Sequence, residues 1–281
     1  DPRPPETYFF TESTGFPSYF GEKPGNFGEL CKLNQHYADL AASIQKVTEE
    51  VLLNMAKYVR QETGMKSLCI AGGVGLNSVA NGRILKESGF ENLYIQPAAG
   101  DGGGALGAAL HAYHSMLGNH RKHVMRHAYW GKSFGNDEVE GFLNAEGIKY
   151  TLAGDEDQLL DRTVEALRDG KVIGWYQGRF EWGPRSLGNR SILADPSREE
   201  MKDVVNTKIK FREPYRPFAP SILSEEAENY FDLPDAARHD PARFMLLVAP
   251  VREEKQASIP ATTHVDGTGR LQTVFEETNP L

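Results

Sequence analysis

Two short apolar segments that each run into a glycine-rich turn constrain the fold of this chain more than any other feature. Residues 67–71 lead into the turn AGGVGLN, and residues 92–96 lead into AAGDGGGALG. Each turn opens a stretch with helical spacing, and another helical pattern precedes the first segment. Strands and helices that alternate in this way predict an α/β fold with a parallel pair of strands.

The start of the chain has a different character from the rest. Residues 1–34 are rich in proline, glycine and aromatic side chains, so we expect an irregular segment there. From Tyr37 to Val59 apolar residues recur at helical spacing, and Gly64 is expected to end this helix.

Residues 118–135 combine polar, basic and glycine residues, and we interpret them as a linker. The linker would separate a domain of residues 1–117 from a second α/β unit of residues 136–281. In the second unit we expect helices at 137–145, 157–168, 197–205 and 224–231, and strands at 148–152, 172–176 and 243–251.

The net charge and the number of cysteines disfavour several classes of protein for this chain. The formal net charge is −8 and the sequence pI is about 5.6, which disfavours a non-specific nucleic-acid binder. The two cysteines, Cys31 and Cys69, are far apart and indicate neither a disulfide framework nor a zinc site. We expect no membrane span and no signal peptide, and a reducing cytoplasm is the expected location.

A cluster of cations stands out against the acidic chain. QGRFEWGPRSLGNRSIL is followed, after a short helical pattern, by NTKIKFREPYRPFAP. A run of charges is often only a solvated face. Guanidinium groups held by glycine and proline turns, however, suit bidentate capture of phosphate or carboxylate oxygens. We therefore predict a phosphate-handling site among Arg179, Arg185, Arg190, Lys208, Lys210, Arg212 and Arg216.

The glycine turns suggest a second ligand. Gly72 and Gly73 precede a helix whose N-terminal N–H groups could meet an anion, although close strand-to-helix packing explains them equally well. Asp101, followed by Gly102 and Gly103, could bind a divalent cation, orient a nucleotide or cap a helix. Two such turns together favour a nucleotide site.

Two sets of histidines are candidates for a site. Those between residues 120 and 127 alternate with basic residues that would repel a metal ion, so we interpret them as a solvated segment. In THVDGTGRLQTV, His264, Asp266 and Arg270 surround two glycines. That arrangement is a candidate substrate site, and an Asp-Gly hairpin turn is the alternative.

Taken together, these segments resemble the O-carbamoyltransferases that make carbamoylated nodulation factors and antibiotics such as tobramycin. The matching stretches are CIAGGVGLNSVANGRIL, IQPAAGDGGGALGAAL, GRFEWGPRSLGNRSIL, NTKIKFREPYRPFAPSIL and THVDGTGRLQTV. The resemblance implies the second half of an actin-like (ASKHA) ATPase domain, followed by an incomplete YrdC-like α/β domain. We therefore expect this chain to be a C-terminal piece of a longer protein.

The resemblance also implies an activity. Such an enzyme uses carbamoyl phosphate and ATP, forms carbamoyl-adenylate, and passes the carbamoyl group to a hydroxyl of a small-molecule or glycoside acceptor. The resemblance assigns the binding of carbamoyl phosphate to Arg185, Lys210 and Arg216, and it gives Arg270 an assisting role. His264 joins these as a catalytic candidate.

The nucleotide and the metal have their own implied residues. The resemblance assigns adenosine to the turn that contains Val74, with Asn77 and the two turns' glycines as further nucleotide contacts. It assigns an iron-type divalent metal beside the nucleotide phosphates to Asp101. The family also needs a pair of histidines one helical turn apart upstream, and this chain has no such pair, so we expect half a metal site.

Two other functions compete with this one. Threonylcarbamoyl transfer to tRNA would call for a basic surface, which the acidic balance disfavours. A non-catalytic nucleotide- or anion-binding module would fit the incomplete metal site. The acceptor is not readable from the sequence, and a homodimer is an open possibility.

Overall fold

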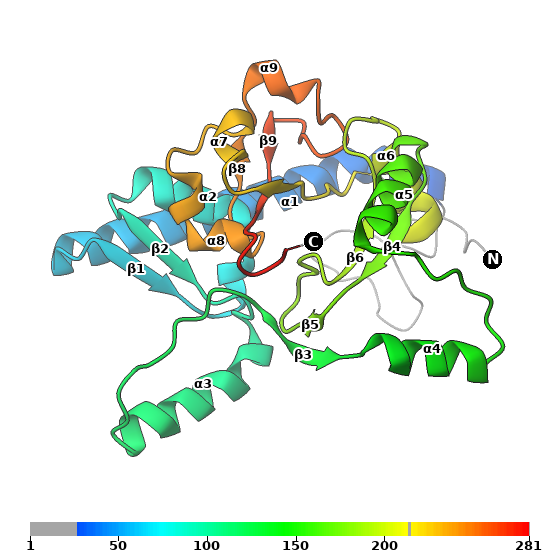
Figure 1. Cartoon of the computed structure of the whole chain (residues 1–281). Helices are drawn as coiled ribbons and strands as arrows, with labels where there is room; N and C mark the ends of the chain where they lie inside the picture. The colour runs from blue at the N-terminus through cyan, green and yellow to red at the C-terminus, as the bar shows by residue number, and fades with distance from the viewer. Residues whose placement is uncertain (1–26, 213–214, 281) are drawn as a thin grey trace.

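The computed structural model describes residues 27–212 and 215–280, with side chains from residue 38 onward, as a mixed α/β protein (Figure 1). Its first element is the long helix α1 (Phe27–Thr63), which ends at Gly64 with φ 66. The predicted helix end is thus confirmed. The expected irregular segment is wrong for residues 27–34, which are helical because no proline interrupts the chain from Phe27 to Thr63; residues 1–26 lie outside the described part.

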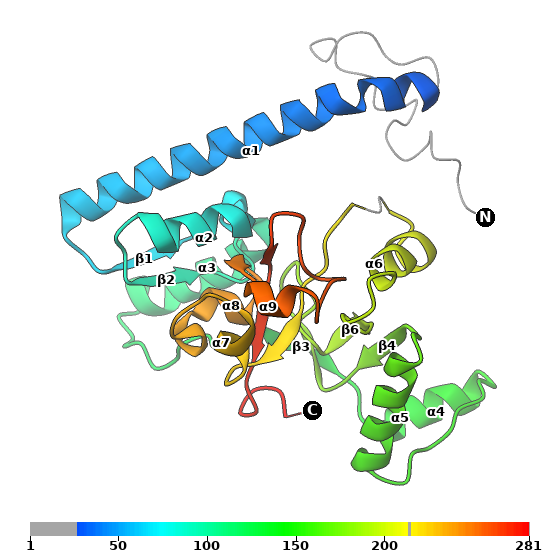
Figure 2. The same ribbon diagram turned by 90° about the horizontal axis from the view of Figure 1, so that it is seen from above.

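The predicted parallel pair of strands is confirmed. Strands β1 (Ser67–Ile70) and β2 (Asn92–Ile95) pair in parallel from Ser67 opposite Asn92 to Ile70 opposite Ile95. Helix α2 (Ser78–Glu87) connects them and packs against α1, and α3 (Gly104–His111) comes after β2, as Figure 2 shows.

The middle of the chain contains two antiparallel pairs. Strand β3 (Tyr129–Ser133) pairs with β5 (Arg179–Glu181), and β4 (Ile173–Tyr176) pairs with β6 (Arg190–Leu193). Helices α4 (Asn136–Ala145) and α5 (Glu156–Arg168) lie where they were predicted. Residues 118–135 are more than a linker, because they contribute β3 and the buried side chains of Met125 and Ala128. Where the two domains divide stays a prediction.

Two predicted strands are wrong. Residues 148–152 form no strand, and Leu152 is 76% exposed. Residues 243–251 begin at the end of helix α8 (Asp240–Arg243), turn at Met245 with φ 54, and reach strand β8 (Ala249–Pro250) only near their end. The turn directs the side chains of this run into two different hydrophobic clusters. The run is therefore apolar without having to pair with another strand along its whole length.

The remaining elements are short. The predicted helices at 197–205 and 224–231 shrink to α6 (Met201–Val204), which continues as a π-helical turn Val205–Ile209, and α7 (Ala227–Tyr230). Strand β7 (Ser221–Leu223) pairs in parallel with β10 (Gln272–Val274), and β8 pairs antiparallel with β9 (Thr268–Gly269); helix α9 is Glu253–Gln256.

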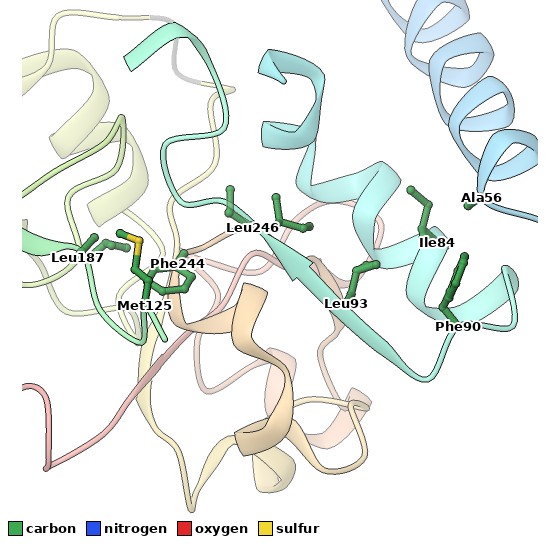
Figure 3. Packing of buried hydrophobic residues seen from close by; sticks show 10 residues of the cluster. Ala56, Ile84, Phe90, Leu93, Met125, Leu187, Phe244 and Leu246 are labelled. Atoms are coloured by element: carbon green, nitrogen blue, oxygen red, sulfur yellow. The ribbon is translucent and has the colours of Figure 1, made fainter. Parts of the chain in front are cut away.

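One buried cluster joins the early and late parts of the chain. Figure 3 shows Ala56, Ile84 and Phe90 at one end of this cluster and Met125, Leu187 and Phe244 at the other. The side chain of Asn81, 1% exposed, adds a polar link: its Nδ2 donates to the carbonyls of Gly75 at 2.8 Å and Leu246 at 2.9 Å. Within the described ranges, none of the helices combines the length and the apolar character needed to cross a membrane.

Candidate functional site

The two glycine turns lie against each other. The N–H of Gly72 donates to the carbonyl of Ala99 at 2.8 Å. Gly72 has φ 99, which favours glycine, and a Cβ placed on Gly72 or Gly73 would meet no atom within 4 Å. The first turn, with the exposed Val74, therefore offers a backbone edge that a ligand can approach closely.

Some of the other residues assigned to the nucleotide also stabilise the local structure. A Cβ on Gly103 would lie 2.1 Å from the carbonyl oxygen of Ala98, so glycine is required there by packing, whereas Gly102 faces open space. The side chain of Asn77 caps α2 by accepting the N–H of Ala80 at 3.1 Å, and it donates to Gln45 Oε1 at 3.0 Å. Nucleotide contacts by these residues stay predictions.

Asp101 is exposed at the start of the short turn Asp101–Gly103. In the described part of the chain, no three His, Cys, Asp or Glu side chains gather closely enough to hold a metal ion. Asp101 by itself is too small a ligand set for an iron-type ion, so the residues present do not fit a complete metal centre.

The loop between β5 and β6, which carries Arg185, lies beside both glycine turns. A Cβ on Gly183 would lie 3.4 Å from the Pro97 carbonyl oxygen at the start of the second turn. Arg185 Nη2 donates to the carbonyl of Leu76 in the first turn at 3.4 Å. Segments that are distant in the sequence thus form one surface.

A buried carboxylate that sequence analysis missed holds this loop. Glu181 is 6% exposed, and its Oε1 accepts the backbone N–H groups of Leu187 at 2.7 Å, Asn189 at 2.8 Å and Arg190 at 3.2 Å. The Leu187 carbonyl in turn accepts bonds from Tyr129 Oη and Gln272 Nε2. The one sequence signal for this role was an acidic residue inside an arginine-rich segment.

Arg185 and Arg270 are half-buried cations without a carboxylate partner among the described residues. Burial, together with the charges of Arg185 and Arg212, lowers the pKa of Arg270 to about 10, and burial lowers the pKa of Arg185. The Nε atoms of both are buried without a hydrogen-bond partner. Across residues 38–212 and 215–280 neither guanidinium forms an ion pair with a carboxylate. Such groups are costly unless an anion joins them.

The charge of Arg212 acts on both Arg270 and the exposed Lys210. Burial and the charge of Arg212 lower the pKa of Lys210. Arg212 Nε donates to Oδ1 of the fully buried Asn206 at 2.6 Å, and its guanidinium lies 4.9 Å from the Phe218 ring centre. Arg212 was noted among the candidate cations, but no specific role was predicted for it.

Arg216 contacts this region through its backbone. The residue is exposed, and its carbonyl accepts Asn206 Nδ2 at 2.9 Å. The assignment of its guanidinium to carbamoyl phosphate stays a prediction. We call Arg185, Lys210, Arg212 and Arg270 the cation cluster from here on.

The turn from His264 to Thr268 places a histidine beside this cluster. The N–H of His264 donates to the Thr268 carbonyl at 2.8 Å, and Gly267 takes φ 76. Burial lowers the pKa of His264; the Asp266 carboxylate opposes this, and the charges of Arg270 and Lys202 add to it. His264 Nε2 is buried without a hydrogen-bond partner.

An open hollow of about 390 Å³ lies away from the cation cluster. It is lined by residues of β3, the β4–β6 region and the C-terminal segment, including Gln177, Arg179, Asn189 and Asn279. Of the cations predicted for phosphate it contains only Arg179.

Two family profiles match the chain. One, described as carbamoyltransferase N-terminus, matches residues 19–110, and the other, carbamoyltransferase C-terminus, matches residues 164–281. The chain belongs to the carbamoyltransferase family. The resemblance inferred from the motifs is thereby confirmed, and the chain is related to enzymes.

Among its relatives are nodulation protein NolNO of Sinorhizobium fredii, 45% identical over 87% of this chain and 36% of that protein, and nodulation protein NolO of Bradyrhizobium diazoefficiens, 44% identical over 88% and 44%. The 3'-hydroxymethylcephem-O-carbamoyltransferase of Streptomyces clavuligerus is 34% identical over 83% of this chain and 42% of the enzyme. The chain spans less than half the length of the curated relatives it matches.

Proposed function

We propose that this chain carries the carbamoyl phosphate-binding and nucleotide-binding parts of an O-carbamoyltransferase. Carbamoyl phosphate would donate its carbamoyl group through carbamoyl-adenylate, made with ATP, to a hydroxyl of a small-molecule or glycoside acceptor. The N-terminal part would be the second half of an actin-like ATPase domain, and the C-terminal part a YrdC-like domain. The two curated cephem enzymes among the relatives carry O-carbamoyltransferase in their names, which supports this acceptor chemistry.

The observation that carries the proposal is the pair of half-buried guanidinium groups of Arg185 and Arg270, which have no carboxylate partner among the described residues. A phosphate dianion supplies the charge that these groups lack. Charge interactions strengthen as water is excluded, so cations fixed before the ligand arrives bind and polarise it effectively.

Each part of the site has a distinct task in this scheme. The cation cluster would bind the phosphate of carbamoyl phosphate, and Glu181 would keep the Arg185 loop in place. The open backbone at Gly72 and Gly73 would receive the nucleotide next to it. Because the residues present do not make a metal centre, no step is assigned to a metal ion here.

Calorimetry on the full chain tests the proposal. Carbamoyl phosphate should bind to the wild type, and Arg185→Lys should weaken it at least about tenfold because the fork geometry is lost. Arg168→Lys, on the exposed end of α5, is the matched control and should bind like the wild type. Equal affinities for Arg185→Lys and wild type would refute the assignment of this site.

A further inference from the structure

Helix α1 is attached to the rest of the fold along one of its faces. On this inner face Leu53 and Ala56 are buried, and the carboxylate of Glu49 pairs with Arg83 of α2, Nη1 to Oε2, at 3.1 Å. In Figure 2, α1 lies at the outer edge of the structure with α2 along one side of it. The inner face therefore fixes the position of α1 before any partner arrives.

The opposite face of α1 carries a stripe of exposed apolar side chains. A helix that packs on one neighbour normally turns polar residues to water on its other side. Here the exposed fractions of the apolar side chains run from 37% for Leu40 to 65% for Ile44. At 3.6 residues per turn they lie opposite Leu53 and Ala56. The stripe, which we name the outer stripe, consists of Leu40, Ile44, Val47, Val51 and Tyr58.

The spacing of the outer stripe is that of a coiled-coil seam. Its apolar residues alternate in steps of four and three from Leu40 to Val51, and the same rhythm continues through Asn54 to Tyr58. In heptad terms the a positions are Ile44, Val51 and Tyr58, and the d positions are Leu40, Val47 and Asn54. Isoleucine and valine at a, with leucine at d, favour a parallel pair of helices. The outer face of α1 thus suits one further helix.

We propose that this helix is α1 of a second copy of the chain, parallel and in register, so that the outer stripe is a homodimer interface. The inference goes beyond the proposed function and does not depend on it. In-register pairing sets each stripe residue against its own counterpart, which makes the seam self-complementary, as a two-fold interface requires. Asn54 then faces Asn54 of the partner subunit, and the two amides can hydrogen-bond to each other, whereas an apolar partner would leave the amide unpaired.

The charges beside the seam agree with this arrangement. In a parallel pair of helices, a residue at g lies beside the e residue of the following heptad on the partner helix. Lys57 is at g, and the e residue that it would meet is Glu62, so this opposite-charge pair forms twice in the dimer. Both residues are exposed. The other g residue, Glu50, would meet the uncharged Met55, so like charges do not face each other.

Sedimentation equilibrium on the full chain tests the proposal, and the wild type should be a reversible dimer. Val51→Lys puts a charge into the seam from each copy and should raise the dissociation constant on the order of a hundredfold or more. Val164→Lys, the same change on α5, is the matched control and should dimerise like the wild type. Val51 is 51% exposed and Val164 is 47% exposed, so both variants should stay folded, which circular dichroism checks.

Disulfide trapping tests the register. In a Cys31→Ser/Cys69→Ser background, Val47→Cys should cross-link to itself on oxidation, because parallel helices in register bring the two copies of position 47 within disulfide reach. Val164→Cys should stay uncross-linked. An antiparallel seam would instead favour cross-linking of Val47→Cys to Tyr58→Cys, and that result would overturn the parallel register.

Two outcomes overturn the interface itself. One is a chain that stays monomeric at the highest concentration reached, which would leave the outer stripe to a different occupant, such as further sequence of a longer polypeptide. The other is a dimer that Val51→Lys leaves unchanged. Carbamoyl phosphate takes no part in either measurement, so both results leave the proposed function standing.

Discussion

Glu181 Oε1 receives the backbone N–H of Leu187 at 2.7 Å, so one buried carboxylate sets the shape of the loop that carries Arg185. Two further N–H groups converge on the same oxygen. The loop is thus ordered by a carboxylate whose Oε1 accepts backbone N–H groups, and this carboxylate forms no ion pair with Arg185.

Replacing Glu181 by Ala should destabilise the protein by about 2–4 kcal/mol, because three N–H groups, two of them in buried hydrogen bonds, lose their acceptor. Glu181→Gln keeps one oxygen and should cost less. Urea unfolding measures both, with the exposed Glu146→Gln as control. If alanine and glutamine cost the same, the convergence of bonds on Oε1 is not what stabilises the loop.

Arg270→Met should raise the stability of the ligand-free protein by about 1 kcal/mol, because it removes a half-buried charge that has no carboxylate partner among the described residues and keeps the apolar volume. The same variant should lose the thermal stabilisation that inorganic phosphate gives the wild type. Thermal melts with and without phosphate measure both effects. A destabilised variant that still responds to phosphate would contradict this account of Arg270.

The pH dependence of stability should contain a contribution from His264. The pKa of His264 in the folded protein lies below the unfolded value of about 6.5. As the pH falls, the ring is therefore protonated in the unfolded chain before it is protonated in the folded protein. The stabilisation is therefore complete above about pH 6.5 and is lost as the pH falls toward the folded pKa. Between pH 7 and 5 the wild type should lose more unfolding free energy than His264→Phe, while exposed His111→Gln should behave like the wild type.

Gly102 and Gly103 form a matched pair for testing the second turn. Gly103→Ala should cost about 1–3 kcal/mol, because its Cβ would lie 2.1 Å from the Ala98 carbonyl oxygen. A Cβ on Gly102 would have no atom within 4 Å, so Gly102→Ala should leave the stability of the protein unchanged. Denaturation of the two variants decides this, and equal stability would mean that Gly103 is not held by packing.

The parallel pair β1–β2 and helices α1, α4 and α5 were predictable because each has a strong, local periodic pattern. Residues 243–251 were misread, since an apolar run looks the same whether a strand or a turn between two cores buries it. The short strands β7, β9 and β10 owe their existence to tertiary pairing and leave little local signal.

Within the site, Arg185, Lys210 and Arg212 were evident as a composition anomaly, whereas Arg270 was assigned to the same ligand only through the resemblance. The charge of Arg185 affects the pKa of Arg270 from 85 positions away in the sequence, and no local pattern encodes that proximity. Glu181 and Asn206 were missed because each acts through backbone groups or a neighbouring side chain, which only the folded chain brings within reach.

The amide of Asn81 has a consequence for communication across the protein. Because the Asn81 amide donates to the Gly75 and Leu246 carbonyls at once, a shift of the first glycine turn would strain the segment that leads into β8. The backbone of that turn and the C-terminal region are therefore anchored to each other through one buried amide group.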